Sequence, residues 1–168
     1  MKNLILLILF VFYGCNDQKT IAQEYKPQEL TIVDFEELKP YLNKNEDKTY
    51  IINFWATWCA PCVKELPYFE DITKTYNTNQ VEVILVSLDF PKQFESKLKP
   101  FIVSKKIQSR VIALNDMDMN TWIPQVDESW SGAIPATIIF NKTKRKFYEK
   151  SFTERELQNE LQQFLNQK

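Results

Sequence analysis

The chain has 168 residues, of which 44% are hydrophobic and 14% aromatic, so it can build one core of ordinary domain size. Its formal net charge is −1, and acidic and basic residues are mixed along the sequence, which gives no electrostatic support for nucleic-acid binding. It contains three cysteines and no histidine, too few ligands for the usual four-coordinate zinc site.

The first 14 residues have the order of an export signal. Lys2 is followed by an uninterrupted apolar run over residues 4–12 and then by the small residue Gly14. A helix needs about 20 apolar residues to cross a bilayer comfortably, so this run is short for a transmembrane span. We therefore predict that residues 1–14 are a signal peptide, the alternatives being an N-terminal anchor or a buried strand.

Gly14-Cys15 is similar to the end of a bacterial lipoprotein signal, in which the cysteine is lipid-modified and becomes the mature N-terminus. Phe12 departs from that pattern, because an aliphatic residue usually stands there. The resemblance implies that Cys15 carries several acyl chains, which hold a protein on a membrane better than one chain does. Residues 15–28 are polar, and we interpret them as a tether to a domain over residues 29–168.

Apolar periodicity predicts the elements of this domain in an alternating order. Residues 32–42 suit a short strand and a helix, with Asp34 as the N-cap. Residues 49–55 form a nearly continuous apolar run, which is typical of a central strand buried on both faces. From Cys59 to Tyr76, apolar side chains recur every three or four residues, which predicts an amphipathic helix.

The second half of the chain continues the pattern in shorter segments. The further predicted elements are a buried strand at 81–88, a helix at 91–106, a short strand at 111–114, a short helix at 118–126, strands at 136–140 and 147–152, and a final helix that a capping-box pattern starts at 153–156. The basic residues within 142–146 suit a solvated hairpin turn. This order predicts an α/β fold with a mixed central sheet and helices on both faces.

Four aromatic residues are expected in the core: Trp55, Phe101, Trp122 and Trp130. For the last three, a groove that binds a partner is the alternative.

Two cysteines remain for chemistry, Cys59 and Cys62, three positions apart at the start of the helix that follows the central strand. Unpaired backbone N–H groups and the dipole at a helix N-terminus stabilise a thiolate, so Cys59 is the predicted nucleophile. Cys62 lies nearly one turn further along on the same side, where it can attack a mixed disulfide formed on Cys59. A purely structural disulfide is one alternative, but so small a loop adds little stability. Zinc binding is another, and it would need ligands from two chains.

The residues around this pair resemble the thioredoxin superfamily. The features that carry the resemblance are the motif FWATWCAPC at 54–62, the buried strand before it, and Ile134-Pro135 ahead of a later strand. Asn53 and Glu65, together with the export signal, are more specifically similar to the membrane-anchored TlpA/ResA-like thiol–disulfide oxidoreductases. The resemblance implies a thioredoxin-like fold with a central insertion, and no cofactor beyond the redox-active cysteine pair.

The resemblance also assigns roles to three residues outside the pair. Pro135 matches the cis-proline that lies beside the thiols and shapes the substrate groove, although a trans proline is the default without the resemblance. Ile134 matches the residue whose backbone pairs with the bound substrate chain. Trp58 matches the aromatic residue beside the nucleophile and is expected to cover part of the active-site surface, with ordinary packing as the alternative.

Glu65 is the candidate acid–base residue. Thioredoxin has a buried aspartate on the strand before the motif, where this chain has Asn53, which cannot take a proton. The resemblance implies that Glu65, three residues after Cys62, lies near the thiols and affects their protonation. We expect it to accept the proton of Cys62 or to raise the thiol pKa by its charge, the alternative being a solvated surface glutamate.

The resemblance implies a lipid-anchored enzyme that faces the periplasm or cell envelope and reduces or exchanges disulfides of exported proteins. We expect a monomer that is recharged by a membrane electron donor. Reduction is favoured over oxidation because Ala60-Pro61 is close to the Gly-Pro of thioredoxin, a reductant. Two alternatives remain: a peroxiredoxin-like thiol peroxidase, disfavoured because Ala56 stands where such enzymes have threonine, and a non-catalytic partner-binding lipoprotein.

Overall fold

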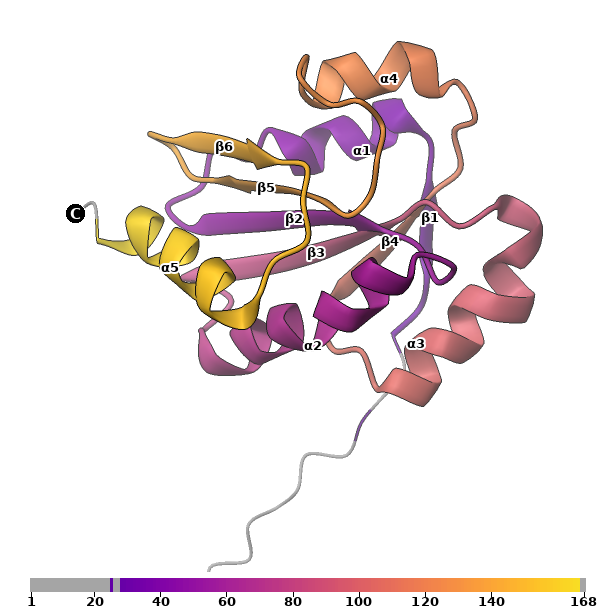
Figure 1. The fold of residues 1–168 in the computed structure, drawn as a ribbon, viewed down its shortest axis with the longest axis horizontal. Helices are drawn as coiled ribbons and strands as arrows, with labels where there is room; N and C mark the ends of the chain where they lie inside the picture. The colour runs from indigo at the N-terminus through magenta and orange to yellow at the C-terminus, as the bar shows by residue number, and fades with distance from the viewer. Residues whose placement is uncertain (1–24, 26–27, 167–168) are drawn as a thin grey trace, which may run out of the picture.

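A computed structural model of the chain describes residue 25 and residues 28–166 (Figure 1). They form one six-stranded sheet with the strand order β1-β4-β3-β2-β5-β6. The strands are β1 Thr31–Val33, β2 Thr49–Trp55, β3 Val81–Ser87, β4 Arg110–Leu114, β5 Ala136–Phe140 and β6 Arg145–Tyr148. Strands β1 to β4 run parallel, whereas β5 is antiparallel to β2 and β6 is antiparallel to β5. The mixed sheet confirms the predicted α/β class.

Helices cover both faces of this sheet. They are α1 Phe35–Leu42, α2 Ala60–Thr75, α3 Lys99–Lys105, α4 Met119–Val126 and α5 Glu154–Leu165, with two short turns, η1 Pro91–Gln93 and η2 Phe94–Leu98, ahead of α3. Helices α2, α3 and α5 lie on one face and α1 and α4 on the other (Figure 1). The prediction of a single helix over 91–106 is wrong in detail, because residues 91–98 form 3-10 and π turns before α3 begins.

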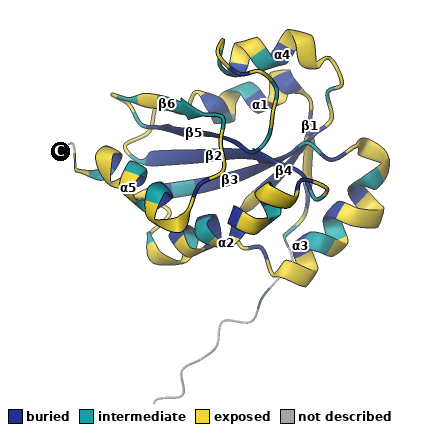
Figure 2. Ribbon diagram, in the orientation of Figure 1, coloured by how far each residue is buried: buried dark blue, intermediate teal, exposed yellow. Residues whose placement is uncertain are grey.

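Strand β2 is central and supplies both halves of the core. All of its residues are buried (Figure 2). Ile51 and Trp55 belong to the cluster under α2, α3 and α5, whereas Ile52 and Phe54 belong to the cluster under α1 and α4. This division follows from the two-residue period of a strand, and it explains why the segment is apolar on both faces.

Three of the four aromatic residues predicted for the core are buried, and the fourth, Phe101, is partly buried and packs against the core. Trp55, Trp122 and Trp130 are buried, and Phe101 packs against the first of them with 5.5 Å between ring centroids. Core packing thus accounts for Phe101 and Trp130, whereas Trp122 is packed in the core and also lines a small surface pocket, so a groove for a partner stays a prediction for Trp122.

Side-chain caps fix the starts of two helices where the sequence predicts them. At α1, the Asp34 side chain accepts the Glu37 backbone N–H, and the Glu37 carboxylate accepts the Asp34 N–H in return. Thr153 and Glu156 form the same reciprocal pair at α5. Each box satisfies backbone donors that the first helical turn leaves without partners.

The last strand differs from its prediction. It covers Arg145–Tyr148 instead of residues 147–152, so part of the basic cluster expected in the turn lies in a strand. Asn141 closes the hairpin early, since its Oδ1 accepts two backbone N–H groups of the turn. Beyond β6 the chain leaves the sheet and turns toward α5, where the Phe152 N–H donates to the Glu65 carboxylate.

The N-terminal segment joins the domain at the sheet edge formed by β1 and β4. Gln28 Oε1 accepts the Val111 N–H at 3.0 Å, and Gln28 Nε2 donates to the Ser109 carbonyl at 2.6 Å. The predicted signal peptide at 1–14, Cys15 and most of the predicted tether lie outside the described residues. None of the helices in the described ranges has the length and hydropathy of a membrane span.

Candidate active site

The thiol pair lies at the junction between β2 and α2. Cys59 is the N-cap of α2, with extended backbone, and its Sγ accepts the Cys62 backbone N–H at 3.3 Å. A disulfide of 1.97 Å joins Cys59 to Cys62, and their Cα atoms are 5.3 Å apart. Pro61 occupies the first turn of α2, where its missing N–H sacrifices no helical hydrogen bond. The pair therefore lies at the helix N-terminus, as the sequence predicts.

The two cysteines differ in exposure. Cys59 keeps 6% of its surface exposed, whereas Cys62 is completely buried. A disulfide of another protein that approaches from solvent therefore meets Cys59 first. This order suits an attacking residue at the surface and a resolving residue behind it.

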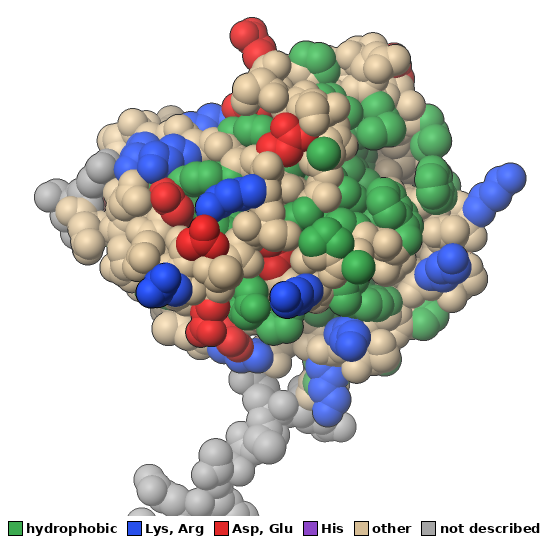
Figure 3. Space-filling view, in the orientation of Figure 1, with side chains coloured by type: hydrophobic (Ala, Val, Ile, Leu, Met, Phe, Trp, Pro, Cys, Tyr) green, Lys and Arg blue, Asp and Glu red, His purple; other side chains and the backbone are tan. Residues whose placement is uncertain are grey.

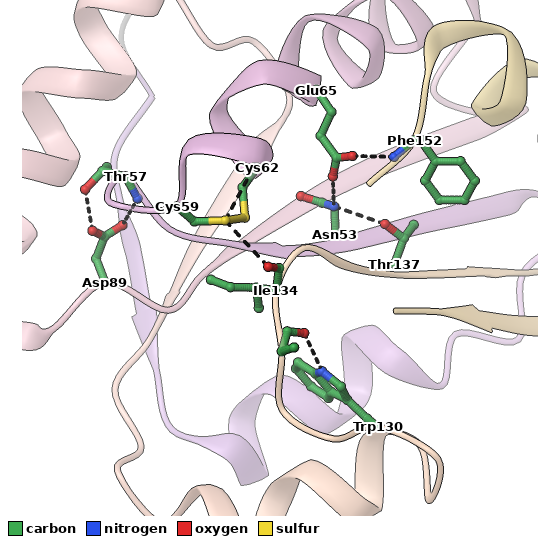
Figure 4. Close-up of a disulfide and its surroundings, with 11 residues drawn as sticks. Asn53, Thr57, Cys59, Cys62, Glu65, Asp89, Trp130, Ile134, Thr137 and Phe152 are labelled. Atoms are coloured by element: carbon green, nitrogen blue, oxygen red, sulfur yellow. Dashed lines mark hydrogen bonds between the residues drawn. A yellow bond between two sulfur atoms is a disulfide. The ribbon is translucent and has the colours of Figure 1, made fainter. Parts of the chain in front are cut away.

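The turn before β5 faces the disulfide from the opposite side of the site (Figure 4). The Ile134–Pro135 peptide bond is cis, and the Ile134 carbonyl oxygen lies 3.7 Å from Cys59 Sγ. The structure thus brings both residues of this turn, 75 positions away in the sequence, next to the nucleophile candidate.

Two residues hold this turn in place in a role that the sequence did not predict: Trp130, which was expected to pack in the core, and Glu149, which was not singled out. Trp130 Nε1 donates to the Ala133 carbonyl at 2.8 Å (Figure 4). The Glu149 carboxylate accepts the backbone N–H groups of Ser131 at 3.1 Å and Ala133 at 2.9 Å. The Ser131 hydroxyl donates to the same carboxylate, and this bond, supported by the two N–H groups, lowers the pKa of Glu149. A glutamate 18 residues beyond its partner gives no local signal in the sequence.

Glu65 is buried, so the alternative prediction of a solvated surface glutamate is wrong. Only 1% of its surface is exposed. Its Oε1 accepts Asn53 Nδ2 at 3.1 Å and its Oε2 accepts the Phe152 N–H at 2.7 Å, while Asn53 also donates to Thr137 Oγ1 at 3.0 Å (Figure 4). Burial raises the pKa of Glu65 to about 7, although the two hydrogen bonds favour its charged form.

The Glu65 carboxylate is close to Cys62 along the helix but is hydrogen-bonded to other residues. Glu65 follows Cys62 by one helical turn on α2, but its carboxylate accepts hydrogen bonds from Asn53 and Phe152. In the oxidised state, Asn53 and Phe152 therefore hold the Glu65 carboxylate, on the same helix as the resolving cysteine.

Asp89 is a second buried carboxylate of the site, and sequence reasoning missed its role. It is 2% exposed and accepts the Thr57 backbone N–H at 3.0 Å, the Thr57 hydroxyl, and the Ser87 hydroxyl at 2.9 Å (Figure 4). These bonds tie the end of β3 to the loop two residues before Cys59. The sequence did offer one signal for this role, a single carboxylate directly after a buried apolar strand. Binding and catalytic residues of parallel sheets usually lie at the carboxyl ends of the strands.

Trp58 lies on the surface beside Cys59. It is 53% exposed, and its ring stacks on Phe90 with 6.3 Å between centroids. This is the surface position that the resemblance implied, and ordinary core packing is not observed. Across the described residues, no group of three or more Cys, Asp or Glu side chains is arranged to hold a metal ion.

Comparison with known proteins agrees with this geometry. Residues 21–145, more than half of the chain, match the AhpC/TSA family. Thiol-disulfide oxidoreductase ResA of Oceanobacillus iheyensis is 48% identical over 48 residues, which cover 29% of this chain and 25% of that protein. ResA of Bacillus thuringiensis subsp. konkukian is 34% identical over 105 residues, which cover 58% and 60%. The chain thus spans between a quarter and three fifths of these relatives.

Solved structures share the fold at low sequence identity. A thioredoxin-related protein from Neisseria meningitidis serogroup B aligns with a TM-score of 0.60 at 19% identity, covering 70% of this chain and 85% of that chain. A thiol-disulfide isomerase from Corynebacterium glutamicum also gives 0.60, at 17% identity, covering 86% and 98%. The chain therefore belongs to the AhpC/TSA family and has the thioredoxin-like fold.

Proposed function

We propose that this protein is a thiol–disulfide oxidoreductase that reduces or exchanges disulfides of exported proteins through Cys59 and Cys62. The observation that carries the proposal is the arrangement of the pair. One cysteine reaches the surface at a helix N-terminus, and the other is buried behind it within bonding distance. Matching segments in ResA proteins named thiol-disulfide oxidoreductases support the same activity.

The reaction follows from this arrangement. The Cys59 thiolate, stabilised at the start of α2, attacks one sulfur of a substrate disulfide, and the other substrate sulfur leaves as a thiolate. The Cys62 thiolate then attacks Cys59 Sγ and releases the second substrate thiolate. Two electrons pass from the protein dithiol to the substrate, both substrate thiolates take up protons, and the protein ends with the Cys59–Cys62 disulfide seen here.

Three neighbours are proposed to position the substrate. Ile134 and Pro135 present backbone beside Cys59 Sγ, where an extended substrate segment can pair with the turn. Trp58 offers an exposed ring at the mouth of the site. These three residues surround Cys59, the only one of the two cysteines with exposed surface.

Glu65 is proposed as the proton acceptor for Cys62. A buried thiol needs a base before it can attack, and a carboxyl group with a pKa of about 7 can take a proton near neutral pH. Its place one helical turn after Cys62 supports this role. Rotation of the side chain away from Asn53, or one bridging water, would complete the path.

The cellular setting is proposed from the N-terminal sequence. Residues 1–14 would direct export, Cys15 would carry the lipid anchor, and the protein would act as a monomer recharged by a membrane electron donor. A Cys15→Ser variant should move from the membrane fraction to the soluble fraction of the envelope. Retention of the variant in the membrane fraction would contradict the lipid anchor.

Insulin reduction separates this activity from its alternatives. With dithiothreitol as the electron source, the protein should accelerate reduction of insulin disulfides, and Cys59→Ser should abolish the acceleration. Peroxide consumption without insulin reduction would favour a thiol peroxidase, although Ala56 stands where threonine is expected for that chemistry. Neither reaction would leave a non-catalytic binding protein.

A further inference from the structure

Exposed apolar side chains gather at one place on the described part of the protein. Large hydrophobic side chains are exposed at six described positions, and four of them line a single pocket: Trp58, Phe90, Met117 and Met119. Figure 3 shows hydrophobic side chains concentrated on this face, between α4 and α3. A contiguous exposed apolar patch on a soluble domain marks a contact site, whereas single exposed residues do not.

The pocket is small and largely apolar. Its volume is about 170 Å³, and its walls include Leu88, Leu114 and Trp122. Pockets for cofactors and drug-sized ligands usually have about 300–1,000 Å³, so this pocket is too small for such a molecule. A cavity of about 150 Å³ accommodates a benzene ring. The pocket therefore has room for one large side chain.

The pocket opens beside the nucleophile. Ile134 lines it, and the carbonyl oxygen of the same residue lies 3.7 Å from Cys59 Sγ. Trp58, which forms another wall, directly precedes Cys59 in the sequence. An extended chain advances about 3.3 Å per residue, so a substrate whose sulfur meets Cys59 passes the pocket within a few residues.

Gly132 keeps one wall of the pocket open. Its φ is +94°, and a Cβ at this position would come within 3.2 Å of Ile123 Cδ1 on α4. A side chain here would strain the backbone and push against α4. Glycine thus preserves the space between the turn and the helix.

We propose that this pocket binds one large apolar side chain, such as Leu, Met or Phe, of a polypeptide substrate, a few residues from the cysteine that Cys59 attacks. The inference rests on the proposed function and names the feature by which the enzyme selects its substrates. Met117 and Met119 are flexible and polarisable, so the pocket accepts apolar side chains of different shapes. Asp116 also lines the pocket, and its charge disfavours an acidic side chain there.

The test uses the full chain carrying Cys15→Ser, in its reduced form. The substrates are short peptides with one cysteine, present as a mixed disulfide with 5-thio-2-nitrobenzoate. In a serine-glycine background, one leucine is moved through the three positions on each side of that cysteine. Cys59 attacks the peptide sulfur and the coloured thiolate leaves, so its release gives a second-order rate constant for each peptide.

We expect leucine at one or two of these positions to raise the rate constant at least about tenfold over the serine peptide, because burial of a leucine side chain is favourable to that degree. Glutamate at the same positions should give no acceleration. The double variant Met117→Ser, Met119→Ser should bring the ratio of leucine to serine rate constants close to one. Val103→Ser is the matched control, since Val103 is an exposed apolar residue outside the pocket, and it should keep the full ratio.

The outcomes separate failure of the pocket from failure of the proposed function. A protein that reacts through Cys59 with the symmetrical nitrobenzoate disulfide but shows no leucine advantage overturns the pocket alone. An advantage that survives in the double variant also overturns it. A protein whose Cys59 reacts with neither reagent overturns the proposed function and this inference with it.

Discussion

Glu65 and Asn53 meet in the buried layer between α2 and β2, with 3.1 Å between Glu65 Oε1 and Asn53 Nδ2. The Phe152 N–H supplies the second hydrogen bond to this carboxylate. Two neutral donors do not fully replace water, so burial raises the pKa of Glu65 to about 7. The carboxyl group therefore changes its charge near neutral pH, one helical turn from Cys62.

Burial of Glu65 should make the stability of the oxidised protein fall as the pH rises. The unfolded chain releases this proton at a pKa of 4.5 and the folded chain at about 7. Between these values the folded state binds more protons, so rising pH favours unfolding. Relative to Glu65→Gln, the free energy of unfolding of the wild type should fall by on the order of 3 kcal/mol as the pH rises from 4.5 to about 7, and it should not fall further above that pH. Urea unfolding of both proteins at several pH values measures the difference.

Glu36→Gln is the matched control for this experiment, because Glu36 is an exposed carboxylate paired with Lys39 on α1. The difference in unfolding free energy between the wild type and Glu36→Gln should stay constant over this pH range. Parallel stability curves for the wild type and Glu65→Gln between pH 4.5 and 7 would mean that Glu65 ionises as an ordinary surface carboxyl group.

The same substitution should slow the resolving step. If Glu65 takes the Cys62 proton, Glu65→Gln should lower the rate of release from the Cys59 mixed disulfide roughly 100-fold at neutral pH. The wild-type rate should rise with an apparent pKa near 7, and this inflection should disappear in the variant. Single-turnover release of a fluorescent peptide from Cys59 measures both effects. An unchanged pH profile would remove Glu65 from the mechanism.

Asp89 should control the loop that carries Thr57. The Asp89 carboxylate accepts three hydrogen bonds, and in Asp89→Asn one of its two oxygens is replaced by an N–H₂ group, which cannot accept them. Each buried donor that loses its partner costs about 1–3 kcal/mol. We expect a lower urea midpoint and faster hydrogen exchange at the Thr57 amide. Asp71→Asn is the control, because Asp71 is an exposed carboxylate paired with Lys74 on α2. Unchanged exchange at Thr57 in Asp89→Asn would show that other contacts hold the loop.

Gly132→Ala should destabilise the protein by about 1–2 kcal/mol, since its φ of +94° suits glycine and the new Cβ would crowd Ile123. Lys106→Gly tests the reciprocal case. Lys106 ends α3 with a φ of 52°, a left-handed conformation in which glycine is preferred. This variant should be as stable as the wild type or up to about 1 kcal/mol more stable. Equal urea midpoints for Gly132→Ala and the wild type would show that the turn relaxes freely.

Sequence patterns predicted the parts of the fold that local chemistry decides. The apolar run of β2, the capping residues Asp34 and Thr153, and the place of Cys59 at the start of α2 all follow from neighbouring residues. The end of β6 did not, because the chain leaves the sheet for a bond between Phe152 and Glu65, which are 87 positions apart.

The supporting residues of the site were missed for the same physical reason. Asp89 reaches Thr57 across 32 positions, and Glu149 reaches Ser131 across 18. Periodicity and motifs describe spacing within one element, so they cannot show which carboxylate folds back onto a loop. Only the three-dimensional structure reveals that Asp89 holds the loop before Cys59 and that Glu149 holds the turn before β5.

The central claim is that Cys59 attacks substrate disulfides and Cys62 completes the exchange, and trapping tests it most directly. A Cys62→Ala protein, also carrying Cys15→Ser, is incubated with a disulfide-linked substrate and analysed by mass spectrometry. A covalent adduct that maps to Cys59 and disappears with dithiothreitol is the predicted result, while the corresponding Cys59→Ala protein should form no comparable adduct. Absence of an adduct on Cys59, or equal trapping on Cys62 in the second protein, would contradict the account.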